Sequence, residues 1–271
     1  MVSNLLEADV ENVLDAAFAG DGQELFVVDP SAETIVSLVE AAVGRDDLPD
    51  MSMLVDEGTL KDVMEDFLVA SKAADLVADG ALDLRVLDEA VDNALFVSPS
   101  RVVVLVSTDD HVAALASDDE EFVGEVFQTH SDAFDDAETY ALRTPAISRV
   151  RETLTAEIGE ATREDFDAVL DAIDSARGDD GGLDEVTVSL LVAARNDVLL
   201  YDISKWGEDV GIASKATFSR TKTRLEDLGV IDTEKVPIDV GRPRLRLKLG
   251  DERLHGLDAA DLADEVASML A

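Results

Sequence analysis

Cationic side chains that could bind phosphate gather near the C-terminal end of this acidic sequence. The 271 residues include 61 Asp and Glu against 22 Lys and Arg, which gives a formal net charge of -39. Ten of the 22 basic residues nevertheless fall in one stretch near the end: Lys215, Arg220, Lys222, Arg224, Lys235, Arg242, Arg244, Arg246, Lys248 and Arg253. Arginine pairs bidentately with guanine, and Lys, Ser and Thr reach phosphates or bases. The cluster therefore indicates a nucleic-acid partner.

One predicted helix carries many of these groups on a single face. Ser214 is placed to cap a helix over residues 215–228, which Gly229 ends. Positions spaced three or four apart are expected to face inward: Phe218, Thr221, Leu225 and Leu228. The expected outward positions are Lys215, Thr217, Ser219, Arg220, Thr223 and Arg224. A DNA recognition helix needs such an apolar side to dock on its own domain and such a polar side to enter the major groove.

The elements around this helix predict a winged helix-turn-helix. They are a helix over 186–194, a strand-like segment 198–201, a helix capped by Ser204 and ended by Gly211, and two wing strands at 230–231 and 245–249. The candidate DNA-binding residues on the third helix and the wing are Ser214, Lys215, Thr217, Ser219, Arg220, Thr223, Arg224, Lys235, Arg242 and Arg244. The alternative is that these long cationic side chains only cover a solvated surface.

The first part of the chain predicts an α/β domain with a mostly parallel sheet and flanking helices. Strand patterns at 25–29, 52–56 and 82–87 alternate with helical patterns at 5–18, 31–43 and 60–77. Residues 94–97 and 101–106 predict two strands that turn at Ser98, Pro99 and Ser100. From about Val112 onward the pattern is helical, and a glycine-rich linker follows at 177–182.

These patterns divide the chain into four parts. We expect an α/β sensing or regulatory domain over 1–110 and a helical connector that mediates dimerisation over 111–178. The winged helix-turn-helix is expected over 183–250, and a C-terminal helix over 251–271.

Sequence resemblance supports the C-terminal prediction. The run GIASKATFSR at 211–220, continued by RLEDLGVI at 224–231, resembles the recognition helix and first wing strand of many prokaryotic regulators. Over its whole length the chain resembles the haloarchaeal TbsP family, regulators named as suppressors of the sugar-responsive regulator TrmB. The resemblance implies control of central carbon metabolism genes in response to sugar, with the residues on the third helix and wing as the functional ones.

An enzyme is the main competing class. The sequence contains no P-loop and no dinucleotide-binding glycine motif after a strand. The three histidines, His111, His130 and His255, are too scattered to indicate a metal site. We therefore expect no catalytic residue, no metal and no cofactor, apart from a small-metabolite effector.

Asp29 and Asp56 are candidate ligand-binding residues, because each ends a predicted strand. Acidic groups at the carboxyl ends of parallel strands lie where doubly wound folds bind ligands. A phospho-acceptor receiver domain would also need a strand-borne lysine, and Ser107 and Thr108 stand where it is expected. Strand-ending Asp is equally typical of a helix cap.

Composition constrains the surroundings of the protein. The sequence has no cysteine, no apolar run long enough to cross a bilayer and no signal-peptide pattern, so a cytoplasmic protein with no membrane partner is expected. The acidic residues are spread through amphipathic segments, which is typical of adaptation to molar salt. At such ionic strength the Debye length is only about 3 Å, so self-repulsion is screened.

Together these observations predict a sequence-specific transcriptional regulator, a repressor of metabolic genes in a halophile. Its expected partners are double-stranded promoter DNA, a second copy of the chain and another sugar-responsive regulator. The alternative is a receiver-like or ligand-binding module whose winged helix docks a protein partner.

Overall fold

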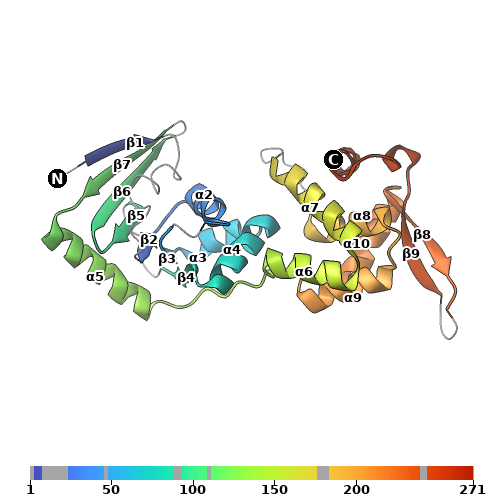
Figure 1. Ribbon diagram of the computed structural model, residues 1–271, viewed down its shortest axis with the longest axis horizontal. Coiled ribbons are helices and arrows are strands. Elements are labelled where there is room, and N and C mark those ends of the chain that lie inside the picture. Colours follow the sequence, from blue (N-terminus) through green and yellow to red (C-terminus); the bar gives the residue numbers. More distant parts are fainter. Residues whose placement is uncertain are drawn as a thin grey trace. The chain divides into compact units, whose positions relative to one another are not determined.

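The computed structural model describes residues 3–7, 24–45, 48–87, 93–108, 111–175, 183–238 and 243–270. The chain forms two compact units, Met1–Leu142 and Arg143–Ala271, which we call unit 1 and unit 2 (Figure 1). The expected helical connector over 111–178 is divided between them. Its first part belongs to unit 1 and its last part to unit 2.

Unit 1 is built on a seven-stranded mixed sheet in the order β1-β7-β6-β5-β2-β3-β4. The strands are β1 (Ser3–Glu7), β2 (Leu25–Val28), β3 (Met51–Val55), β4 (Leu82–Val86), β5 (Leu95–Ser98), β6 (Arg101–Thr108) and β7 (His111–Ser117). β2, β3 and β4 are parallel neighbours, whereas the other pairings are antiparallel. The antiparallel part of the sheet follows from the predicted turn at 98–100. This turn reverses the chain, and β5, β6 and β7 extend the sheet as a meander. The α/β prediction is confirmed, with a mixed rather than mostly parallel sheet.

Helices cover both faces of this sheet (Figure 1). They are α2 (Ala32–Ala42), α3 (Glu57–Val63), α4 (Phe67–Asp79) and α5 (Glu120–Asp136). Alternate residues of β2 enter different cores: Leu25 and Val27 pack into the core that includes α2 and α4, while Phe26 and Val28 pack with residues of α5. Burial on both faces explains why β2 is a continuous apolar run.

Three segments of unit 1 differ from the predicted helices. Residues 3–7 form β1 where a helix was expected to begin, and the rest of that helical pattern lies outside the described residues. Residues 111–117 form β7, where Ala114 and Ala116 are buried and Leu115 between them is exposed. This period-2 alternation is that of a half-buried strand. The predicted helix 60–77 is two helices, α3 and α4.

Unit 2 contains the predicted winged helix-turn-helix. Its elements are α6 (Ile147–Glu157), α7 (Glu160–Ser175), α8 (Glu185–Arg195), α9 (Leu200–Val210), α10 (Lys215–Asp227), β8 (Ile231–Val236), β9 (Arg244–Leu249), η1 (Glu252–Leu254) and α11 (Ala259–Leu270). Helices α8, α9 and α10 are the three helices of the motif. Strands β8 and β9 pair antiparallel as the wing, and Leu199 bridges to Arg246 as a short third strand.

The winged helix is extended by α6, α7 and α11. α11 packs on α7, α7 packs on α8, and α6 packs on α9. The indole Nε1 of Trp206 on α9 donates a hydrogen bond of 3.0 Å to Thr153 Oγ1 on α6. The predicted C-terminal helix therefore exists and is part of unit 2.

The two helices of the helix-turn-helix lie in close contact at Gly207. A Cβ atom at this position of α9 would lie 2.3 Å from Cζ of Phe218 on α10. Phe218 is fully buried. Only glycine therefore lets α10 dock at this distance, and after Val210 the chain turns through Gly211, whose φ is +100°.

We expect Gly207→Ala to destabilise unit 2 by about 1–3 kcal/mol, because the methyl group overlaps a buried ring. The measurement is thermal unfolding followed by the fluorescence of Trp206, the sole tryptophan of the chain. Gly124→Ala is the matched control, because a Cβ at that position of α5 meets no atom within 4 Å. Circular dichroism should show that this control is as stable as the wild type or slightly more so. Equal unfolding midpoints for Gly207→Ala and the wild type would contradict the packing argument.

Candidate nucleic-acid interface

The N-terminus of α10 is fixed by Ser214, as predicted. Ser214 Oγ accepts a hydrogen bond of 3.2 Å from the backbone N–H of Thr217 and lies 3.0 Å from Thr217 Oγ1. Its own backbone is extended, which is typical of an N-cap. The cap sets where the helix begins and therefore which side chains share its outer face.

The outer face of α10 is polar and cationic. Phe218 and Leu225 are buried against the rest of unit 2, as expected. Except for Thr217, which is half-buried, the predicted outward residues are exposed: Lys215, Ser219, Arg220, Thr223 and Arg224. The inward prediction is wrong for Leu228, whose exposed fraction is 44% because α10 has already ended at Asp227.

The prediction that Ser204 caps the second helix is also wrong. Helix α9 begins at Leu200, and its N-cap, Leu199, lies five residues before the predicted one. Ser204 is buried inside the helix, and its hydroxyl donates to the carbonyl of Tyr201 at 3.2 Å. The earlier start adds a turn to α9, and this turn carries Tyr201 and Asp202.

Lys215 is held by a carboxylate of α9. Its Nζ lies 2.5 Å from Glu208 Oε2, and its backbone N–H donates to Glu208 Oε1 at 3.4 Å. The side-chain hydrogen bond lowers the pKa of Glu208 and raises the pKa of Lys215 from their ordinary values. Both groups are therefore ionised at neutral pH, and the lysine charge is locally balanced.

Arg244, at the start of β9, is held in the same way. Its Nη1 lies 3.3 Å from Asp202 Oδ1, and its guanidinium lies over the ring of Tyr201 at 4.3 Å from the centroid. Cation–π stacking and an ion pair together orient the guanidinium. Tyr201 and Asp202 were not predicted as site residues, because the sequence placed them before the second helix.

The remaining wing cations divide into paired and unpaired groups. Arg246 lies 3.7 Å from Glu234 Oε2, and Lys248 lies 2.7 Å from Asp197 Oδ1. Lys235 is exposed and makes no ion pair with a described residue. Arg242 lies outside the described residues. On α10, Arg220 and Arg224 likewise form no ion pair within the described part of the chain; the nearest polar partner of Arg220 is Thr217 Oγ1, at 3.4 Å.

In unit 1, the structure brings Asp29 and Asp56 to one edge of the sheet. They follow β2 and β3, which are parallel neighbours. Asp56 caps α3, since its Oδ1 accepts from the N–H of Thr59 at 3.0 Å. Asp29 has a φ of +49° and donates its N–H to the carbonyl of Leu54, whereas the cap of α2 is Ser31. A ligand-binding role for the pair stays a prediction.

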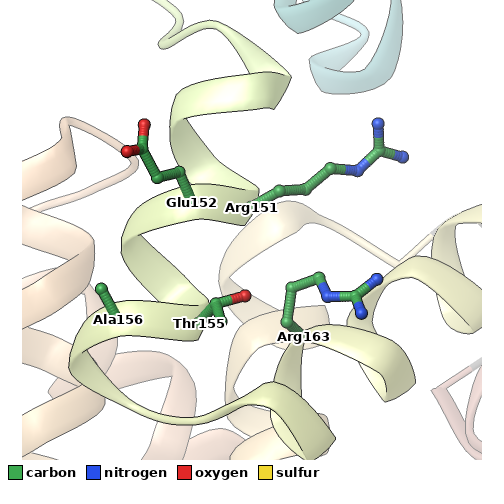
Figure 2. Close-up of a pocket in the computed structure, with 5 residues that line it drawn as sticks. All are labelled: Arg151, Glu152, Thr155, Ala156 and Arg163. Atoms are coloured by element: carbon green, nitrogen blue, oxygen red, sulfur yellow. The ribbon is translucent and has the colours of Figure 1, made fainter.

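A surface hollow in unit 2 is lined by Arg151, Glu152, Thr155, Ala156 and Arg163 (Figure 2). The two arginines extend toward the same side, and Glu152 points away from them. Both arginines bind Asp167 of α7, at 2.7 Å from Arg151 Nε and 2.8 Å from Arg163 Nη1. The hydrogen bond to Asp167 raises the pKa of Arg163. The contact of Arg151 joins α6 to α7, and the contact of Arg163 lies within α7, so Asp167 helps to brace unit 2.

The described residues contain no group of three acidic, histidine or cysteine side chains that could hold a metal ion. His130 is half-buried on α5, and burial lowers its pKa. Among the described helices, none has the length and apolar character needed to span a membrane.

Family comparisons match both units. Residues 2–145 match the family described as "Transcriptional regulator TbsP-like, N-terminal", and residues 146–267 match "Transcriptional regulator TbsP-like, C-terminal HTH domain". The chain belongs to the TbsP-like transcriptional regulators. The boundary between the two matches lies within a few residues of the boundary between unit 1 and unit 2. The family resemblance found in the sequence is thereby confirmed, and the match to the helix-turn-helix domain includes α9 and α10.

Comparisons with individual proteins add little to this assignment. No match to a curated protein was found. Among solved structures, TrmBL2, described as an archaeal chromatin protein with a novel mode of DNA binding, is 15% identical with a TM-score of 0.37, covering 51% of this chain and 54% of its own. Nuc, a phospholipase D family member from Salmonella typhimurium, is 11% identical with a TM-score of 0.35, covering 52% of this chain and 99% of its own. The chain thus spans about half the length of the first of these proteins.

We expect Ser214→Ala to destabilise unit 2 by about 1 kcal/mol, because the N–H of Thr217 loses its acceptor. Urea unfolding monitored by Trp206 fluorescence would measure the loss. Ser219→Ala is the control on the same helix, because the Ser219 side chain is exposed and makes no hydrogen bond to a described residue. If the two variants unfold at the same urea concentration, the cap does not stabilise α10.

Proposed function

We propose that the chain is a sequence-specific regulator that binds double-stranded promoter DNA through α10 and the wing. The observation that carries the proposal is the outer face of α10. Its residues Ser219, Arg220, Thr223 and Arg224 are all exposed, and all four are polar or charged. This face has the polar, cationic character and helical shape that the major groove accommodates. Helix α10 would read bases, and Lys235, Arg242 and Arg244 would contact phosphates.

Arg220 is the proposed base reader. It lies one turn and a half into α10, and N-terminal residues of a recognition helix are the ones that contact base edges. Its guanidinium is exposed and has no carboxylate partner among the described residues, so it is available for a bidentate contact with guanine. The hydroxyl of Thr223 donates to the carbonyl of Ser219 at 3.1 Å, which leaves its oxygen as an acceptor toward the groove.

The biological role we propose is repression of metabolic genes in a halophile, in response to a small metabolite sensed by unit 1. The acidic composition supports the salt adaptation, and the family assignment supports the regulatory role. Central carbon metabolism genes and another sugar-responsive regulator are the proposed targets and partner. High salt weakens the counterion-release part of DNA affinity, so base contacts would carry a larger share.

Arg220→Ala should weaken binding to the cognate promoter by about 1–3 kcal/mol and should bind the cognate and scrambled duplexes more equally. Fluorescence anisotropy in molar KCl, with the chain's own promoter and central-metabolic promoters, would measure both effects. Arg253→Ala is the control, because this exposed arginine is already paired with Asp251 and Glu265.

The three possible results separate the two candidate functions. If the wild type binds the promoter selectively, and Arg220→Ala loses this selectivity while Arg253→Ala keeps it, the result supports the regulator. Selective binding that Arg220→Ala leaves intact removes this residue from the interface. If the wild-type chain binds promoter and scrambled duplexes equally, the result would favour the alternative, in which the winged helix docks a protein partner.

A dimer is the second expectation, because winged-helix repressors commonly bind two half-sites about one helical turn apart. We place its interface in the helical part of the chain between 112 and 176. Phe122 on α5 supports this placement, because 48% of its surface is exposed. Light scattering in molar KCl should give twice the mass of one chain, and Phe122→Glu should shift that mass toward the monomer. A monomeric wild type would rule out the dimer.

A further inference from the structure

We propose that two carboxylates of α9, Glu208 and Asp202, act as built-in counterions of the DNA-binding face, by which we mean α10 and the wing. DNA phosphates must displace both carboxylates from their cations. They would thereby set both the affinity for DNA and its dependence on salt. The inference rests on the proposed DNA-binding function. It assigns a role to residues that themselves cannot attract DNA, since both carry a negative charge.

Glu208 occupies the position of an anion at the start of α10. Its two carboxylate oxygens contact both the ammonium group and the backbone N–H of Lys215, at 2.5 and 3.4 Å. The exposed N–H groups at a helix N-terminus, together with a nearby cation, form a common phosphate-binding arrangement. Glu208 therefore holds the groups that a DNA phosphate would contact.

Asp202 is the corresponding counterion of Arg244. The ion pair spans 3.3 Å between Arg244 Nη1 and Asp202 Oδ1, while the guanidinium stacks on Tyr201. Tyr201 also lies close enough to Lys215 to contribute to its raised pKa. Tyr201 thus stacks on one of the two paired cations and lies within electrostatic reach of the other. Tyr201 is itself exposed, with 48% of its surface accessible.

This arrangement changes the net number of counterions that DNA binding releases into solution. When an unpaired cation binds DNA, the phosphate it neutralises releases a counterion, and log K falls with log salt by about 0.9 per contact. When Lys215 or Arg244 moves from its carboxylate to a phosphate, the freed carboxylate takes up a cation from solution. That uptake offsets the release from DNA. The paired residues therefore add phosphate contacts with little salt dependence, while Lys235, which makes no ion pair with a described residue, contributes the ordinary dependence.

The test compares single-charge variants of the full chain by fluorescence anisotropy over KCl concentrations from tenths of molar to molar. Glu208→Gln should bind the promoter several-fold more tightly at low salt and should steepen the slope of log K against log salt by about 0.9. Asp202→Asn should behave in the same way. The matched control is Asp209→Asn, which removes the same charge from the next position of α9. Asp209 forms its ion pair with Lys205, at 2.5 Å, and acts on Lys215 only as a nearby charge, so the control keeps the charge effect and leaves the Glu208–Lys215 contact in place.

A double-mutant cycle separates the local pair from a general charge effect. In a Lys215→Ala background, Glu208→Gln should change neither the affinity nor the slope beyond the change caused by Asp209→Asn. Equal effects of Glu208→Gln and Asp209→Asn in the otherwise wild-type chain, with DNA still bound, would overturn this inference alone. A wild-type chain that binds no duplex would overturn the proposed function and the inference with it. Trp206 fluorescence would verify that each variant is folded.

Discussion

The close contact between Gly207 and Phe218 is the constraint on which the proposed DNA-binding face, formed by α10 and the wing, depends. With no side chain at Gly207, the Phe218 ring packs directly on α9, and this fixes how far apart α9 and α10 lie. Gly211 then reverses the chain with a positive φ, and Ser214 starts α10 in the register that buries Phe218 and Leu225. A second close approach fixes the wing, where a Cβ on Gly250 would lie 2.4 Å from the carbonyl oxygen of Gly229. The direction of every candidate contact on α10 follows from these glycine positions.

The helices outside the motif explain why this geometry can be rigid. Asp165 of α7 binds both Arg195 and Asn196 at the end of α8, at 3.0 and 2.7 Å. Arg195 also donates to the carbonyl of Leu257, just before α11. Trp206 adds the link between α9 and α6. The winged helix is therefore braced by α6, α7 and α11, and these additions lie within one unit and one family match. A brace of this kind suits a recognition helix that must discriminate bases, because small displacements of a bidentate arginine lose its hydrogen bonds.

Local sequence patterns predicted the structure wherever one strong signal decided it. Ser214 and Gly229 bound α10, and the C-terminal helix expected over 251–271 is present as α11, which begins at Ala259. The prediction failed where two periodicities compete. Residues 111–117 contain three alanines, which favour a helix, but pairing with β6 and β1 makes them a strand. Ser204 resembles a cap, yet the apolar residues before it begin α9 a turn earlier. The partners of the cations were also beyond local reasoning. Asp202 and Arg244 are 42 residues apart, and only the fold brings them into contact.

The charge on the DNA-binding face is smaller than the sequence suggests. The cluster of ten cations near the C-terminus was interpreted as the sign of a nucleic-acid partner. In the structure Lys215, Arg246 and Lys248 are each paired with a carboxylate, whereas Arg220 and Arg224 have no such partner among the described residues. An arginine without a carboxylate partner on the outer face of α10 is suited to contact base edges. A paired cation at the edge of that face is suited to contact phosphates. In the molar salt proposed for this protein, long-range attraction would be screened within about 3 Å, so neutralising these cations would cost little affinity. In the proposed complex, the paired cations would also suppress binding to DNA of any sequence and leave discrimination to the few cations that can contact bases.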